Sequence, residues 1–107
     1  MTTAPTMYRQ GDVFLQRVEK SVRGLAEVPR ENGAIVLAHG ELTGHAHAIH
    51  AKNARLLTDG ADRFLRVVRR TVALTHEEHA PITLPPGVYR VVRQREYHPQ
   101  EIRTVAD

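Results

Sequence analysis

The sequence contains no cysteine and no tryptophan, and aromatic residues make up only 5% of its 107 residues. The absence of cysteine excludes a disulfide framework, an iron–sulfur cluster and a cysteine nucleophile, so any bound metal must take nitrogen or oxygen ligands. Serine is almost as scarce, because Ser21 is the only one and no nucleophile-elbow motif surrounds it. The chain therefore offers no serine or cysteine nucleophile of the usual hydrolase kind.

Long apolar runs are also missing. The longest uninterrupted apolar stretch covers residues 34–38, far short of the roughly 20 residues that a membrane-spanning helix needs. The first six residues contain neither the basic nor the apolar segment of a signal peptide. We therefore expect a cytoplasmic protein without a membrane partner.

The charge balance is modest, with 15 Lys and Arg against 12 Asp and Glu and a formal net charge of +3. The excess is divided over both halves of the chain, so neither half forms a basic arm. Nucleic acid is thus permitted as a partner but not demanded. With 41% hydrophobic and 25% charged residues, a chain of this length is typical of one globular domain.

Short runs of strand-forming residues, separated by glycine and proline, predict an all-β protein, either a small single-domain β-barrel or a sandwich. The clearest predicted strands cover residues 12–18, 34–38, 63–68, 70–75 and 88–97. We expect an N-terminal tail over residues 1–10, a β-domain over 11–97, and a C-terminal tail or short helix over 98–107. Short exposed strand edges in such a domain could pair between copies, so the sequence is compatible with a homo-oligomer.

The segment 45–57 fits two structures. As a strand it would place His45 and His47 on one face, because side chains alternate with a period of two. As a helix its alanines would be favourable and its apolar residues would also share a face. The neighbouring Gly40 and Gly44 favour the strand.

Histidine is the unusual residue, with seven in the chain. Five of them lie in two short clusters: His45, His47, His50, His76 and His79. On a strand, the spacing of His45 and His47 points two imidazoles the same way, about 7 Å apart. Neutral ring nitrogens in that arrangement suit a metal ion.

The second cluster, His76-Glu-Glu-His79, directly follows a predicted strand and adds two imidazoles and two carboxylates. We therefore predict a divalent transition-metal site with candidate ligands His45, His47, His76 and His79. The nitrogen and oxygen donors fit Zn, Fe, Mn, Ni or Cu without selecting one. Glu77 and Glu78 could act as a general base beside a metal-bound water, or simply form a solvated turn.

A purely structural interpretation of the histidines stands beside this one. Single histidines are commonly surface residues or hydrogen-bonded core residues, and a pair with one residue between arises by chance in a histidine-rich chain. Neighbours three apart, such as His76 and His79, are expected to converge only on a helical turn.

The segment Gly40-Glu-Leu-Thr-Gly-His45-Ala-His47 resembles the opening of the first motif of the cupins, and Leu84-Pro-Pro-Gly87 is similar to the Pro-x-Gly turn of their second motif. The resemblance implies a small β-barrel that binds metal, with His45 and His47 as ligands, and a cupin-like metalloenzyme of unspecified substrate.

The chain departs from the cupin pattern at two places. Ala51 and Lys52 stand where the first motif has its glutamate, and Arg90 stands where the second motif has its histidine. For a complete site, His76 or His79 would have to supply the missing ligands.

The alternative function is a non-enzymatic module that binds nucleic acid or protein. On the last predicted strand the period of two gives Tyr89, Arg93, Arg95 and Tyr97 a common face. Aromatic rings and guanidinium groups on one sheet face could stack on bases and contact phosphates. The structural interpretation is a solvated face on which arginine stems cover apolar surface.

Overall fold

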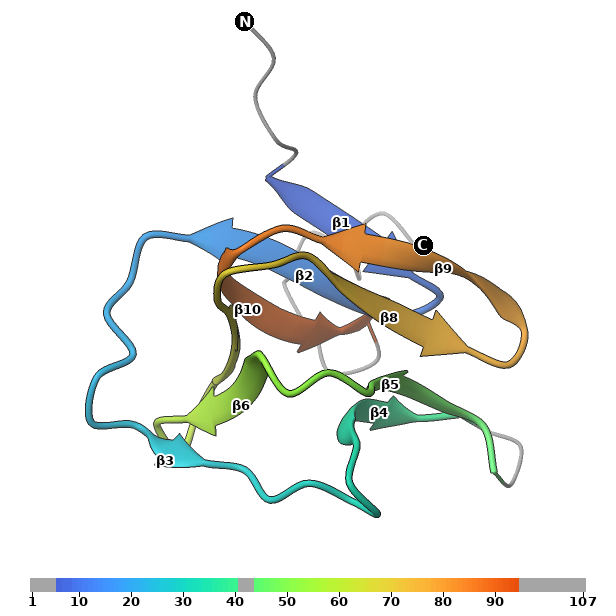
Figure 1. Cartoon of the computed structure of the whole chain (residues 1–107), viewed down its shortest axis with the longest axis horizontal. Coiled ribbons are helices and arrows are strands. Elements are labelled where there is room, and N and C mark those ends of the chain that lie inside the picture. Colours follow the sequence, from blue (N-terminus) through green and yellow to red (C-terminus); the bar gives the residue numbers. More distant parts are fainter. Residues whose placement is uncertain (1–5, 41–43, 95–107) are drawn as a thin grey trace, which may run out of the picture.

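The computed structural model describes residues 6–40 and 44–94, and within these ranges the chain forms ten β-strands in two antiparallel sheets (Figure 1). The strands are β1 (Met7–Gln10), β2 (Val13–Val18), β3 (Ala26–Glu27), β4 (Ile35–His39), β5 (Ala46–Ile49), β6 (Ala54–Thr58), β7 (Arg63–Val67), β8 (Val72–His76), β9 (His79–Leu84) and β10 (Gly87–Arg93). The described residues contain no helix long and apolar enough to cross a membrane.

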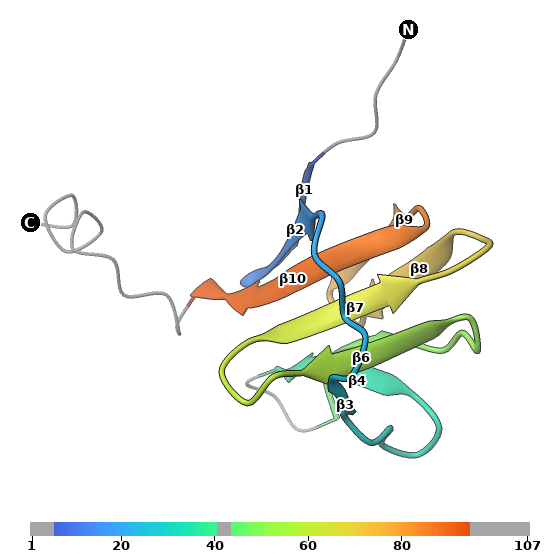
Figure 2. The same ribbon diagram turned by 90° about the vertical axis from the view of Figure 1, so that its left-hand side faces the viewer.

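The larger sheet has the strand order β1-β2-β10-β7-β6-β3 (Figure 2). The smaller sheet has the order β4-β5-β8-β9. The all-β prediction is confirmed. Of its two forms the structure adopts the sandwich, because the sheets pack against each other without closing into a barrel. The segment that fitted both strand and helix forms β5 and β6.

The sheet also begins earlier than expected. Met7–Gln10 lie within the predicted N-terminal tail, yet they form edge strand β1 and pair with β2. Gly11 and Asp12 make the turn between the two strands, and Gly11 has a positive φ of 58°, which glycine adopts without steric cost. The predicted C-terminal tail or helix over 98–107 lies outside the described residues.

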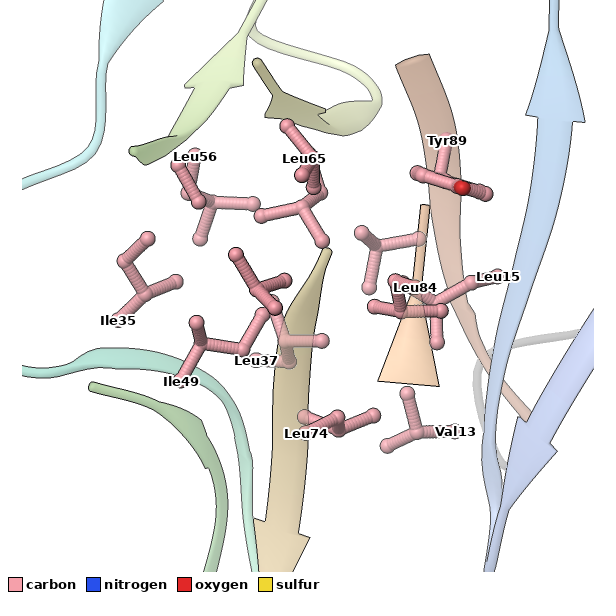
Figure 3. Packing of buried hydrophobic residues seen from close by; sticks show 14 of the residues in the cluster. Val13, Leu15, Ile35, Leu37, Ile49, Leu56, Leu65, Leu74, Leu84 and Tyr89 are labelled. Carbon is pink, nitrogen blue, oxygen red and sulfur yellow. The ribbon is translucent and has the colours of Figure 1, made fainter. Parts of the chain in front are cut away.

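The core fills the space between the two sheets (Figure 3). In β2, Val13 and Leu15 are fully buried while Phe14 between them is not, as the period of two requires. The other large side chains that are fully buried are Leu37, Ile49, Leu56, Leu65, Leu74, Leu84 and Tyr89. Each such leucine contributes about 2 kcal/mol through removal of apolar surface from water.

One polar side chain, Gln10 at the end of β1, links the two sheets. Only 3% of Gln10 is exposed. Its amide nitrogen donates to the Leu74 carbonyl in β8 at 2.9 Å and to the Ala80 carbonyl in β9 at 3.0 Å. These bonds tie β1 to the hairpin of β8 and β9. They therefore position the histidines of the second cluster, His76 and His79.

Candidate metal centre

Four histidines meet at one end of the sandwich: His47 from β5, His76 from β8, His79 from β9, and His45, which directly precedes β5. His76 is central: its ring centroid lies 4.3 Å from that of His47, 4.7 Å from that of His79 and 5.8 Å from that of His45. The rings of His47 and His79 stack at 5.8 Å. All four predicted ligands are therefore brought together in the structure.

The strand pairing explains this convergence. His76 and His79 are direct partners across the two-residue turn between β8 and β9. Thus a β-hairpin brings them together, and the expectation that a helical turn would be needed is wrong. Ala48 of β5 pairs with Thr75 of β8, and continuing this antiparallel register by one residue places His47 opposite His76.

The tightest group of potential ligand atoms comes from His45, His76 and Glu77, whose ligand atoms all lie within 4.8 Å of one another. Glu77 is exposed, but its Oε1 accepts a hydrogen bond from the Ala46 backbone N–H at 3.0 Å, which holds the carboxylate against β5. This bond is the main cause that lowers the pKa of Glu77, with smaller contributions from its own backbone N–H and from His45 and His76. The carboxylate is thus anionic and fixed beside two imidazoles.

The buried histidine, His47, is oriented by Gln10. Since the Gln10 amide nitrogen donates to two strand carbonyls, its oxygen is the atom that faces His47, and it lies 2.8 Å from His47 Nδ1. An amide oxygen only accepts, so Nδ1 carries the proton. In the neutral ring Nε2 then keeps its lone pair, as in a metal-binding histidine whose other nitrogen donates to a carbonyl.

That lone pair lies close to a carboxylate. His47 Nε2 is 3.6 Å from Asp12 Oδ1, and Asp12 Oδ2 is 3.4 Å from Arg93 Nη2. Burial, and next the charge of His76, lower the pKa of His47 from 6.5 to about 4, while Asp12 acts in the opposite direction. Two ligands of one tetrahedral metal ion with bond lengths near 2.1 Å lie about 3.4 Å apart, so the observed separation suits a shared cation.

His76 already uses one of its nitrogens. Its Nδ1 accepts a hydrogen bond from the Glu78 backbone N–H at 3.0 Å, so in the neutral ring the proton is on Nε2. A metal at Nδ1 would displace that N–H. A metal at Nε2 would move the ring proton to Nδ1, where it would oppose the same N–H. Either way, metal binding must break this bond.

Two glycines, Gly11 and Gly40, lie directly against the histidine side chains. A β-carbon on Gly40 would lie 3.0 Å from His45 Cβ and 3.4 Å from His76 Nε2, and one on Gly11 would lie 2.8 Å from His79 Nε2. These distances are below or at the limit of ordinary contact, so only glycine lets the backbone approach the imidazoles this closely.

Two of the histidines that we did not choose as ligands lie elsewhere on the surface, and the third, His98, lies outside the described residues. His39 is exposed and pairs with Glu31 at 3.0 Å, and His50 is exposed just after β5. Sequence reasoning named Glu77 only as a candidate base, and it missed Asp12 and Gln10 altogether. For Glu77 the signal was its place between two histidines, whereas nothing in the sequence connects the β1–β2 turn with the histidines.

The sheet face proposed for nucleic acid does not exist as expected. Tyr89 has 0% exposure, and its hydroxyl donates to the Pro85 carbonyl, so it cannot stack on a base. Arg93 shares its face, as the period predicted, but its side chain is only 16% exposed and is held by Asp12. Arg95 and Tyr97 lie outside the described residues. This face of β10 carries Tyr89 and Val91, which belong to the core that the second sheet covers.

Comparison with known proteins gives one match. A family described as a domain of unknown function (DUF8820) matches residues 9–94, which includes every residue of the cluster. No curated protein and no solved structure matches the chain.

Proposed function

We propose that the protein, which belongs to the DUF8820 family, binds a divalent transition-metal ion at its histidine cluster. The description of the family assigns no function, so the proposal rests on the chemistry of the site. The observation that carries the proposal is the group of His45, His76 and Glu77, with ligand atoms within 4.8 Å of one another. Two imidazoles and a carboxylate are donors that Zn, Fe, Mn, Ni and Cu accept.

Two further imidazoles, those of His47 and His79, lie next to His76 and are candidates for a fourth ligand. His47 is the better placed, since its Nε2 keeps a lone pair and its ring lies 4.3 Å from that of His76. His79 lies 4.7 Å from His76 and is exposed at the rim of the cluster. We propose His47 as the fourth ligand and His79 as the residue that covers the open side of the ion.

A cupin-like metalloenzyme activity would add a reaction to this site. The resemblance carries over His45 and His47 as ligands, and both lie in the cluster, which supports a metal there. With Glu77 proposed as a ligand, the carboxylate of Glu78, 3.6 Å from His45 Nδ1, is the group that we propose as a base beside the ion. Catalysis, a cytoplasmic location and a homo-oligomer remain predictions.

Elemental analysis of untagged, purified protein tests the proposal directly, since an affinity His-tag would itself bind metal. We expect close to one equivalent of Zn, Fe, Mn, Ni or Cu, either as purified or after loading and dialysis. The double variant His45→Ala/His76→Ala should lose that metal while keeping its β-rich circular dichroism spectrum, because both side chains are only partly buried.

The matched control is His39→Ala/His50→Ala, which removes the same two imidazoles from exposed positions outside the cluster and should bind metal like the parent. If the parent takes up no metal, or if both double variants lose it equally, the proposal is wrong. Separate His47→Ala and His79→Ala variants then assign the fourth ligand: the first should weaken binding strongly and the second only slightly.

The hydrogen bond between Glu78 and His76 supplies a second readout that does not depend on activity. Loading the parent with Zn²⁺ should shift the Glu78 backbone amide signal and speed its hydrogen exchange, because binding removes its acceptor. The Ala46 amide, which donates to Glu77, should also shift. A loaded protein in which the Glu78 amide stays unchanged would rule out His76 as a ligand.

A further inference from the structure

A second region, outside the histidine cluster, gathers positive charge. A hollow of about 830 Å³ lies where β6 begins and β7 ends, two strands that run side by side in Figure 2. It is lined by Ala51, Lys52, Asn53, Ala54, Arg55, Arg66, Val68, Arg69 and Arg70. Five of these nine residues are Lys or Arg, and none is acidic or aromatic.

Two of the arginines face each other across the sheet. Arg55 and Arg66 are direct partners in the pairing of β6 with β7, and both are exposed. Like charges at directly opposed positions destabilise a sheet. Among the described residues no carboxylate lies within 4.0 Å of either guanidinium group, so nothing in this part of the chain offsets their repulsion.

The turn after β7 adds two more arginines, Arg69 and Arg70, and its backbone conformation needs hydrogen bonds to stabilise it. Arg69 has a positive φ of 71°, which is unfavourable for a residue with a β-carbon. The Asn53 amide donates to the carbonyls of Val68 and Arg70 at 2.9 and 2.8 Å. These bonds fix the turn, and the turn places Arg69 and Arg70 on the wall of the hollow.

We propose that this basic hollow binds a compact ligand that carries several phosphate groups. Guanidinium groups donate two parallel hydrogen bonds to a phosphate, and four of the five cations are arginines. A ligand with several negative charges would relieve the repulsion between Arg55 and Arg66. The volume of the hollow falls within the range of small-ligand sites, and the absence of aromatic rings from its lining disfavours single-stranded nucleic acid, which uses them for base stacking.

Titration calorimetry with inorganic tripolyphosphate tests the assignment. Metal-free protein is used because polyphosphates chelate metals, and the basic hollow contains none of the proposed metal ligands. We expect the parent to bind tripolyphosphate more tightly than orthophosphate, with an affinity that falls as salt is added. The double variant Arg55→Gln/Arg66→Gln should lose about tenfold in affinity for each guanidinium removed, as expected for charge-assisted hydrogen bonds.

The control is Arg23→Gln/Arg63→Gln, which removes the same net charge from residues that do not line the hollow, and it should bind like the parent. Thermal melts confirm that both variants are folded. An equal loss in the two variants would mean a general charge effect and overturn the proposal, as would equal binding of orthophosphate and tripolyphosphate or no binding at all. Tighter binding of a thymidine oligonucleotide, with the same dependence on Arg55 and Arg66, would assign the surface to nucleic acid instead.

Discussion

The histidine cluster and the basic hollow differ in how their polar and charged groups are paired. At the cluster, polar groups find partners inside the protein: Gln10 holds His47, and Asp12 lies between His47 and Arg93. In the hollow, Arg55 and Arg66 face each other without a carboxylate in reach among the described residues. The first region is organised by contacts within the protein, whereas the second holds opposed charges that no carboxylate of the described residues offsets.

The two regions also differ in how far their side chains are buried. His47 is 3% exposed and is bonded to Gln10, whose side-chain amide links the two sheets, while the hollow's cations are all exposed. Changes at the buried residues Gln10 and His47 should therefore destabilise the fold as well as the site. Changes in the hollow should affect binding and leave the fold intact or more stable.

The largest effect is expected for Gln10→Leu. It removes the bonds that Gln10 makes to the carbonyls of Leu74 and Ala80 and to the Nδ1–H of His47, and leaving a buried polar group unsatisfied costs about 1–3 kcal/mol. We expect a loss of about 3 kcal/mol in the free energy of unfolding, measured by urea denaturation. The exposed Gln16 on β2 gives the control: Gln16→Leu should change stability by less than about 0.5 kcal/mol. Equal effects would mean that the buried amide contributes nothing to stability.

A smaller effect is expected for Gly40→Ala, which acts on the cluster by crowding. The added methyl group would press on His45 and His76, costing about 2 kcal/mol of stability through overpacking. By displacing both rings it should lower metal affinity about tenfold, as changes to groups that orient ligands do. Gly24→Ala is the control, since it adds the methyl group in open space at a positive φ of 83°. That variant should lose some stability but no metal affinity, and a loss of affinity in both would remove crowding as the cause.

The smallest expected effect is a gain in stability rather than a loss. Arg55→Gln removes one of two opposed charges and should raise the free energy of unfolding by about 0.5 kcal/mol at low salt. The gain should shrink as salt screens the parent's repulsion. Arg63 lies on the same sheet but pairs with Thr58, so Arg63→Gln should show no such gain. A loss of stability in Arg55→Gln would show that the arginine stem matters more than its charge.

The strand positions could be predicted from the sequence because alternation and glycine breakers are local signals. The same signals correctly grouped Tyr89 with Arg93 on one face of β10. They did not reveal that this face is covered, since that depends on the second sheet. For the same reason the N-terminal residues 7–10 were assigned to a tail although they complete the larger sheet.

For the histidine cluster, too, the sequence predicted one part and the tertiary structure decided the other. The donors themselves, His45, His47, His76 and His79, could be named from their spacing, because ligand chemistry belongs to residue types. Their convergence depends on the pairing of β5 with β8 and on the hairpin of β8 with β9. The contribution of Gln10 depends on contacts about 37 residues and more away along the chain, which no local pattern contains.

By itself, then, the sequence determined an all-β domain rich in imidazole, free of thiol chemistry and without a long apolar run, since composition and short-range periodicity decide these properties. Tertiary structure alone decided that the two sheets form a sandwich, that Tyr89 is core, and that Arg55 meets Arg66. The physical reason is the same in each case: these outcomes are set by which distant strands become neighbours, and that pairing is a property of the whole chain.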